Sequence, residues 1–537
     1  MMEKYNYRKD PHQDIDHVFR DLLPAHGMVE RPAQMELSHQ MLDTMLNGSI
    51  ALCDAGTGIG KTYAYLVAGV VFRRYRSRAC LPNQPLLISS SSIALQGAII
   101  HDYLPFLSKV MMADGMLDSP LRAVLRKGKS HYVCDARLMK RLQTANLDRK
   151  NPLAKAALLS MRYHLDLDMA PHLSGYDRER ICVTPTCDCG KTECRYLCYL
   201  DVCASDRYAI QVCNHNLLLA DAIHRGSGKR PILPDSCAIV MDEAHKLPET
   251  ARQMFGITLA EEELHTLCRK LRREQFLLAA ETLEDTAGLL LSEMAKPWSG
   301  DSSFSHFSIP LDGVERTLSV IHRQIRRMLT AGTRMELERV LDKTKLFCLH
   351  QPDMVYYTAE DETGGSMLCA SATDLTAQLR QTLWQQDRPM ILASGTLAVG
   401  SNFRRFKEET GLLAEGRVRE HIAPSPFDYQ RNCLLYLPPI PPSQADSDYY
   451  DDLAEQIVKL LDAANGHALG LFTSYAAMSA VRERLKQRDL PYPVLTLGRN
   501  GGHTLSEFMA HPGSVLLAAG AAWEGFDFPG DCVSLLI

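Results

Sequence analysis

The chain has 537 residues and a formal net charge of −5, with 46% hydrophobic and 23% charged residues. This composition is typical of a soluble protein of several domains, and no run of about 18 uncharged apolar residues is present, which excludes a membrane-spanning helix. The first ten residues lack the apolar core of a signal peptide, so we expect a cytoplasmic protein. Because the net charge is negative, a nucleic-acid partner would have to bind locally basic surface.

The N-terminal part of the chain predicts one helix before the first strand. Residues 1–30 are polar and are expected to form an extension. Residues 35–46 have the spacing of an amphipathic helix, which ends at Asn47 and Gly48 as helix C-termini often do. Arg31 and Gln34 directly precede this helix.

Residues 50–62 carry the most specific pattern in the chain. A short apolar run, predicted to be a buried strand, leads into a glycine-rich turn that closes on Lys61 and Thr62, and a helix follows. Small residues let backbone N–H groups face phosphate oxygens, and the helix N-terminus adds positive potential. Lys61 can reach the β- and γ-phosphates, and the Thr62 hydroxyl can bind Mg²⁺. The pattern predicts a loop that binds a nucleoside triphosphate, formed by Ala55, Gly56, Thr57, Gly58, Ile59, Gly60, Lys61 and Thr62.

Further strands alternate with helices after this loop. The alternation favours an α/β fold, in which helices cover a parallel sheet. Strands are predicted at residues 85–92, 209–215 and 237–241.

The last of these strands runs into Asp242, Glu243, Ala244 and His245. Ligands of parallel sheets bind at the carboxyl ends of the strands, so this segment and the phosphate-binding loop can converge on one nucleotide. Asp242 can hold Mg²⁺ through water, and Glu243 can polarise the attacking water.

A cysteine-rich segment interrupts the alternation at residues 111–205, which we interpret as an insertion. Seven of the 16 cysteines lie within residues 182–213. In a chain without an export signal they are not expected to form disulfides, so the cluster indicates a metal site. Four thiolates suit an iron–sulfur cluster or zinc alike, and spacing alone leaves the metal open.

The rest of the chain predicts a helical insertion and then a second sheet. Residues 256–352 have long, leucine-rich helical patterns. Strands at residues 354–358, 366–370 and 390–393 are expected to complete the first sheet domain, and a second α/β domain is expected from residue 398. Its predicted strands are residues 434–437, 468–474 and 514–518. Residues 533–537 are again strand-like, so we expect a truncated domain.

In their order, these patterns resemble superfamily 2 helicases of the DinG/XPD type with a DEAH box, over nearly the whole chain. Residues 55–62 correspond to motif I of that family, and residues 242–245 correspond to motif II. The weaker matches follow in the same order: Arg31 and Gln34 resemble the Q motif, residues 89–96 motif Ia, residues 394–397 motif III, residues 425–427 a segment common in the family, residues 472–474 motif IV, and residues 523–527 motif V.

The resemblance implies two RecA-like P-loop domains around an ATP cleft. The first would comprise residues 31–110, 206–255 and 353–397, interrupted by an iron–sulfur insertion at residues 111–205 and a helical arch at residues 256–352, and the second would comprise residues 398–537. A [4Fe–4S] cluster would be bound by Cys134, Cys182, Cys187 and Cys194, with Cys189 and Cys198 as rival ligands.

The resemblance also implies roles for single residues. Gln34 would read adenine, Glu524 and Asp527 would lie at the nucleotide, and His245 would couple the nucleotide state to the second domain. Asn214 and His215 resemble a further family segment, in which the histidine is either structural or faces DNA.

The implied activity is DNA-stimulated ATP hydrolysis with Mg²⁺, which drives a monomer 5′→3′ along single-stranded DNA and unwinds duplex or fork DNA in repair or replication. The family's motif VI, whose arginine reaches the γ-phosphate, has no counterpart after Asp527. We therefore expect this chain to bind ATP but to hydrolyse it poorly. The alternative is an ATP- and DNA-binding clamp or sensor without productive unwinding.

Overall fold

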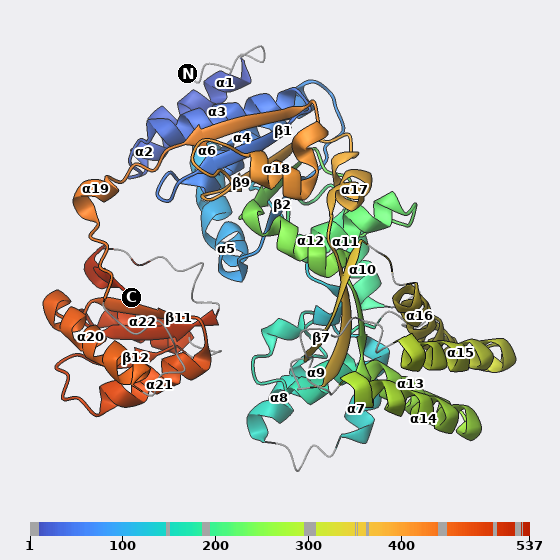
Figure 1. Ribbon diagram of the computed structural model, residues 1–537. Helices are drawn as coiled ribbons and strands as arrows, with labels where there is room; N and C mark the ends of the chain where they lie inside the picture. Colours follow the sequence, from blue (N-terminus) through green and yellow to red (C-terminus); the bar gives the residue numbers. More distant parts are fainter. Residues whose placement is uncertain are drawn as a thin grey trace. The chain divides into compact units, whose positions relative to one another are not determined.

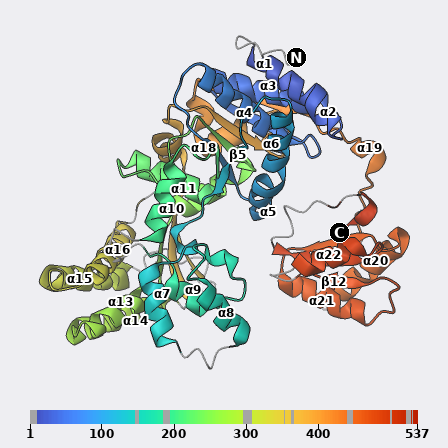
Figure 2. The same ribbon diagram turned by 180° about the vertical axis from the view of Figure 1, so that it is seen from behind.

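The computed structural model describes residues 10–145, 151–184, 194–294, 308–349, 351, 353–360, 365–438, 448–497, 502–520, 528 and 530–537. The chain forms two compact units, one of residues Met1–Ser91 and Ile100–Pro426 and one of residues Ser92–Ile99 and Phe427–Ile537. Figure 1 and Figure 2 show the elements of each unit from opposite sides. Within the described residues, no helix is long and apolar enough to cross a membrane.

The first unit is built on a seven-stranded parallel sheet in the order β10-β1-β9-β5-β2-β4-β3. The central strands are short apolar runs buried on both faces, as a parallel sheet covered by helices requires. The strands are β1 (Ile50–Ala55), β2 (Leu86–Ser90), β3 (Ala123–Leu125), β4 (Ile210–Cys213), β5 (Ala238–Asp242), β9 (Met390–Ser394) and β10 (Val418–Ala423). The predicted α/β fold is confirmed.

Helices of three groups surround this sheet or extend from it (Figure 1). Those of the sheet domain are α1 (Pro11–His17), α2 (Leu23–Ala25), α3 (Pro32–Leu46), α4 (Lys61–Arg78), α6 (Leu104–Ala113), α11 (His215–Gly226), α12 (Leu247–Phe255), α17 (Thr376–Leu379) and α18 (Arg404–Thr410). The cysteine-rich insertion holds α7 (Asp135–Thr144), α8 (Pro152–Ser160), α9 (Gly175–Ile181) and α10 (Arg195–Ala204). The arch holds α13 (Glu261–Arg273), α14 (Leu277–Met294), α15 (Ser308–Ile325) and α16 (Ala331–Cys348).

Two boundaries near the start of the first unit differ from the prediction. The described part of the N-terminal extension is integral to the sheet domain, because Ile15 and Val18 are fully buried and α1 packs against α3 and α4. The buried Asp14 carboxylate also pairs with Arg78 of α4 at 3.4 Å. The insertion begins later than residue 111, because β3 pairs with β4 in the main sheet.

The arch is not all-helical as predicted. Strand β6 (Ile257–Ala260) pairs with β8 (Ser366–Ala372), which also pairs with β7 (Met354–Glu360), in a separate antiparallel sheet. This sheet shares its core with the arch helices, so residues 354–372 do not belong to the first sheet domain as expected. Exposure alternates along β7, which is the pattern of a half-buried antiparallel strand.

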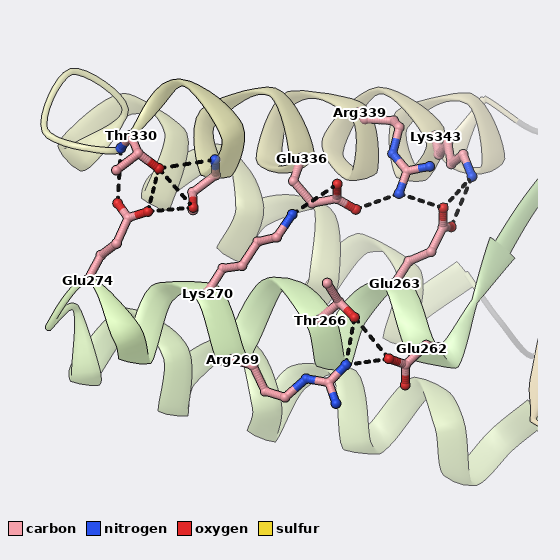
Figure 3. Close-up of polar contacts among 11 residues, drawn as sticks. Glu262, Glu263, Thr266, Arg269, Lys270, Glu274, Thr330, Glu336, Arg339 and Lys343 are labelled. Atoms are coloured by element: carbon pink, nitrogen blue, oxygen red, sulfur yellow. Dashed lines mark hydrogen bonds and ion pairs between the residues drawn. The ribbon is translucent and has the colours of Figure 1, made fainter. Parts of the chain in front are cut away.

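Polar pairs link α13 to α16 along the arch (Figure 3). Glu263 accepts hydrogen bonds from Lys343 at 2.8 and 2.9 Å and pairs with Arg339 at 3.0 Å. At the other end of the helices, Glu274 accepts hydrogen bonds from the Thr330 N–H at 3.0 Å and from its hydroxyl at 2.6 Å. These contacts fix the register of the two helices.

The second unit contains a parallel sheet in the order β12-β13-β11-β14. Its strands are β11 (Ala468–Phe472), β12 (Val494–Thr496), β13 (Val515–Ala519) and β14 (Leu535–Leu536), and its helices are α5 (Ile93–Ala98), α19 (Tyr429–Asn432), α20 (Tyr449–Ala464), α21 (Tyr475–Lys486) and α22 (Gly502–Ala510).

Two predictions for the second domain are wrong. β10 pairs with β1 in the first sheet, so the second domain begins after Ala423 rather than at residue 398. Residues 434–437 form no strand, and Leu434 is 93% exposed. A short apolar run does not reveal by itself whether a sheet has a place for it.

Candidate functional site

The phosphate-binding loop lies between the end of β1 at Ala55 and the start of α4 at Lys61. Gly58 and Gly60 have positive φ angles of 83° and 88°, which glycine adopts without strain. A Cβ atom on Gly60 would lie 2.0 Å from the Gln34 Nε2 atom, so a side chain at this position would have to displace Gln34. The Lys61 ammonium donates a hydrogen bond to the Ala55 carbonyl oxygen at 3.1 Å, across the mouth of the loop.

Two residues from the start of α3 support this loop from outside. Arg31 donates a hydrogen bond to the Gly58 carbonyl at 2.6 Å, and Gln34 donates one to the Gly60 carbonyl at 2.7 Å. Gln34 is only 3% exposed. Sequence reasoning missed this bracing role, and the contact of Gln34 with adenine remains a prediction.

The carboxyl ends of β1, β9 and β5 bring the predicted catalytic residues to one edge of the sheet. Asp54 is in register with Ser394, and Asp242 is in register with Ala393. Lys61 of α4 lies close enough for its charge to favour a lower pKa at both Asp242 and Glu243, although burial outweighs this effect at Asp242. The sequence prediction that motifs I and II converge therefore agrees with the geometry.

The two carboxylates have opposite electrostatic environments. Burial, together with the charge of Glu243, raises the pKa of Asp242 to about 6. The hydrogen bond to His245 lowers the pKa of Glu243; burial opposes this shift and the charge of Lys61 adds to it. Glu243 thus stays ionised more readily than Asp242, which suits a group that accepts a hydrogen bond from water.

Both oxygens of Asp242 are oriented by hydrogen bonds. The backbone N–H of Glu243 donates to Oδ1 at 3.0 Å, and the Tyr65 hydroxyl donates to Oδ2 at 3.1 Å. Tyr65 lies on α4 and is fully buried. Sequence reasoning missed it, although a tyrosine within an apolar helix face signals a hydroxyl that needs a partner.

His245 and Ser394 form a small network with Glu243. His245 Nδ1 lies 2.8 Å from Ser394 Oγ and 3.2 Å from Glu243 Oε2, and the Ser394 hydroxyl donates to the same carboxylate oxygen at 3.3 Å. The network joins motif II to residues 394–397, which the sequence predicted as motif III. Glu243 has a positive φ of 54°, an unusual backbone conformation for a residue other than glycine.

The donor set fits a magnesium nucleotide. Carboxylate oxygens and a threonine hydroxyl are the hard ligands that Mg²⁺ prefers, and Thr62 is half-buried at the second residue of α4. Lys61 and the loop N–H groups supply the positive charge for phosphates. Glu524 and Asp527, predicted from motif V, lie outside the described residues.

Three of the predicted cluster ligands come from neighbouring elements of the insertion. Val133 and Cys182 form an antiparallel bridge, and the Cys134 N–H donates to the Ile181 carbonyl at 2.7 Å. Cys134 and Cys194 are the N-cap residues of α7 and α10. Arg195 donates to the Asp135 carboxylate at 2.8 Å, which ties these two helix N-termini together.

The positions of Cys134 and Cys194 at helix N-termini suit thiolates. Helix N-termini favour thiolates, because the backbone N–H groups stabilise negative charge. Cys187 and the rival Cys189 lie outside the described residues. Within the described ones, no group of three cysteine, histidine or acidic side chains could hold a metal ion, so Cys134, Cys182 and Cys194 do not form a metal site by themselves. Cys198, the other rival, is exposed on α10.

Comparison with known proteins identifies helicases. A helicase C-terminal domain family matches residues 457–537. The ATP-dependent DNA helicase YoaA of Haemophilus influenzae is 26% identical over 542 residues, which cover 95% of this chain and 81% of the relative. The ATP-dependent helicase DinG of Mycobacterium tuberculosis is 25% identical over 557 residues, which cover 96% of this chain and 82% of the relative.

A solved structure of Xpd4 from S. tokodaii overlaps 90% of this chain and 80% of its own, with a TM-score of 0.47 and 15% identity. That overlap is too loose to carry an argument. The motif order and the sequence relatives agree: over nearly its whole length, the chain is similar to ATP-dependent helicases of the DinG and YoaA type.

Proposed function

We propose that the chain is an ATP-dependent DNA helicase, which hydrolyses ATP to move along single-stranded DNA and separate duplexes. The convergence of Lys61, Asp242 and Glu243 at one sheet edge is the main support. The relatives named ATP-dependent DNA helicases, aligned over 95% of this chain, support the same assignment.

In this proposal, each residue at the sheet edge has a defined task. The loop N–H groups hold the phosphates, and Lys61 neutralises charge on the β- and γ-phosphates. Mg²⁺ bound near Asp242 and Thr62 would polarise the phosphoryl oxygens. Glu243 accepts a hydrogen bond from the attacking water, while His245 and Ser394 hold its carboxylate in place.

The insertion supplies the finer part of the proposal. Cys134, Cys182 and Cys194 would bind a [4Fe–4S] cluster with Cys187 as the fourth ligand. The folded insertion would act as a wedge while the motor moves 5′→3′, at forks or other structures in DNA repair or replication. Residues 89–96 are expected to contact the single strand. The protein would bind phosphates and stack on bases, so it would show little sequence preference.

The direct test is ATP hydrolysis with and without single-stranded DNA. Glu243→Gln should lower the rate by about 10²–10⁴-fold and leave ATP binding intact, because general base assistance has that magnitude. Glu249→Gln is the matched control, since Glu249 is an exposed carboxylate in the first turn of α12. Tight DNA binding without any stimulation of hydrolysis would instead favour the clamp.

A further inference from the structure

His215 is a buried residue that has no role in the catalytic steps proposed above. It begins α11 directly after β4, and Asn214 caps the helix by accepting a hydrogen bond from the Leu217 N–H at 2.9 Å. The His215 side chain is only 2% exposed. Direct contact between His215 and DNA, one of the two readings that the sequence left open, therefore has no support in this structure.

The ring of His215 connects two strands of the sheet. Its Nδ1 atom lies 2.7 Å from the Ser89 hydroxyl at the end of β2. β2 lies between β4 and β5, with Ser89 opposite both Cys213 and Met241 and with Ser90 opposite Asp242. The histidine thus reaches from β4 over the end of β2 towards the turn that carries Asp242 and Glu243.

The other ring nitrogen is buried beside that turn without a well-formed hydrogen bond. Within the described part of the chain, His215 Nε2 has no hydrogen-bond partner in good geometry. Burial lowers the pKa of His215 to about 4, while hydrogen bonding to the backbone of Glu243 and Asp242 acts in the opposite direction, so the ring faces the turn through contacts that are too long or too bent to be well-formed hydrogen bonds. A buried polar atom without a partner is unfavourable and needs an explanation.

The neighbouring turn is strained as well, because Glu243 has a φ of 54°. Two unfavourable features therefore adjoin each other in this structure. A small rotation of the peptide after Asp242 would relax the backbone and bring a carbonyl or N–H group towards Nε2. Strain of this kind is typical of segments that have two arrangements.

We propose that His215 is a positioning residue that transmits the conformation of the Asp242–Glu243 turn to Ser89 at the end of β2. Nucleotide binding moves the turn, the turn pairs with His215, and the hydrogen bond to Ser89 repositions the segment that begins there. That segment, residues 89–96, is the one expected to contact DNA, so this inference rests on the proposed function.

The test is the effect of nucleotide on DNA affinity, which needs no hydrolysis. The fluorescence anisotropy of a labelled oligothymidylate gives its Kd with and without a non-hydrolysable ATP analogue. In the unmutated chain we expect the analogue to change that Kd by at least about fivefold, as is usual for coupled sites. His215→Phe keeps an aromatic ring but removes both nitrogens. It should bring the ratio of the two Kd values, without and with the analogue, close to one. The affinities for DNA alone and for the analogue alone should change less than about threefold.

Two further variants distinguish coupling from a merely structural role. Ser89→Ala should also bring the Kd ratio towards one. The double variant should have the same ratio as His215→Phe alone, because both substitutions interrupt one path. His421→Phe on β10, a partly buried histidine at the other edge of the sheet, should leave the ratio unchanged.

The inference would be overturned if His215→Phe kept the Kd ratio of the unmutated chain, or if the effects of the two substitutions were additive in the double variant. If His215→Phe does not fold, the inference would be overturned by a Ser89→Ala variant that keeps the Kd ratio of the unmutated chain. A chain that binds both ligands without coupling also refutes the role of His215, whereas a chain that binds no DNA refutes the proposed function itself.

Discussion

The Tyr65 hydroxyl donates a hydrogen bond to Asp242 Oδ2 over 3.1 Å and so joins the helix after the phosphate-binding loop to the strand of motif II. Both residues are buried: Tyr65 is fully buried, and only 2% of Asp242 is exposed. The bond is therefore shielded from water, and it orients the carboxylate that is expected to hold Mg²⁺. The helix that follows the loop and Asp242 cannot move independently while this bond persists.

Tyr65→Phe should weaken Mg²⁺-dependent ATP binding by about 3–10-fold, because one hydrogen bond to a charged group is lost without a change of volume. A titration of Mg²⁺ against a fluorescent ATP analogue measures the shift. Tyr63→Phe is the control, because Tyr63 lies on the same helix and packs edge-on against Tyr103 instead. An unchanged Mg²⁺ dependence in Tyr65→Phe would contradict the orienting role.

Cys194→Ser should remove most of the iron and the visible absorbance of the cluster from anaerobically purified protein. The thiolate at the N-cap of α10 is a proposed ligand, and a serine hydroxyl binds iron weakly. Cys203→Ala on the same helix should keep both signals, because Cys203 is buried away from the proposed ligand set. The iron content and the visible absorbance, measured together, show whether Cys194 binds the cluster. Zinc in place of iron would refute the iron–sulfur assignment.

His17 should give the first unit a pH-dependent stability. Burial alone would lower the pKa of His17, but hydrogen bonds to Asp21 at 2.7 Å and Asp114 at 3.0 Å, with both charges, raise it above 6.5. The protonated form is thus favoured in the folded state. Its contribution is fully present below the unfolded pKa of about 6.5 and is lost as the pH rises through the higher folded value.

The measurement is the Tm of the unmutated chain and of His17→Gln across this range. The difference should be largest below about pH 6.5 and should shrink at higher pH. Asp114→Asn should show a loss in the same window. A difference that grows with pH would show that the sign is wrong.

Glu263→Gln should destabilise the arch by about 1 kcal/mol, because Glu263 is a half-buried partner of both Lys343 and Arg339 and also accepts a hydrogen bond from the Ala260 N–H. Glu262→Gln, which removes an exposed pair with Arg269, should cost far less. Hydrogen exchange of α13 and α16 reports the local effect. Equal protection in the two variants would show that these contacts do not fix the helix register (Figure 3).

The sequence predicted the positions of the sheet-edge residues better than the domain boundaries. Residues 50–62 and 242–245 are local patterns in which strand, turn and helix follow one another, so their positions at strand ends could be inferred directly. β10 and β3 are short strands far in sequence from their partners, and only the tertiary pairing with β1 and β4 assigns them. The bracing by Gln34 and the hydrogen bond from Tyr65 depend on side-chain directions that spacing does not reveal.

Strand separation tests the central claim most directly. Duplexes with a 5′ or a 3′ single-stranded tail are mixed with the chain, ATP and Mg²⁺, beside the Lys61→Ala variant. The account predicts slow, ATP-dependent separation of the 5′-tailed duplex, even less separation of the 3′-tailed one, and none with Lys61→Ala. If ATP and DNA are both bound while each duplex stays paired, the chain is a clamp and the helicase assignment is wrong.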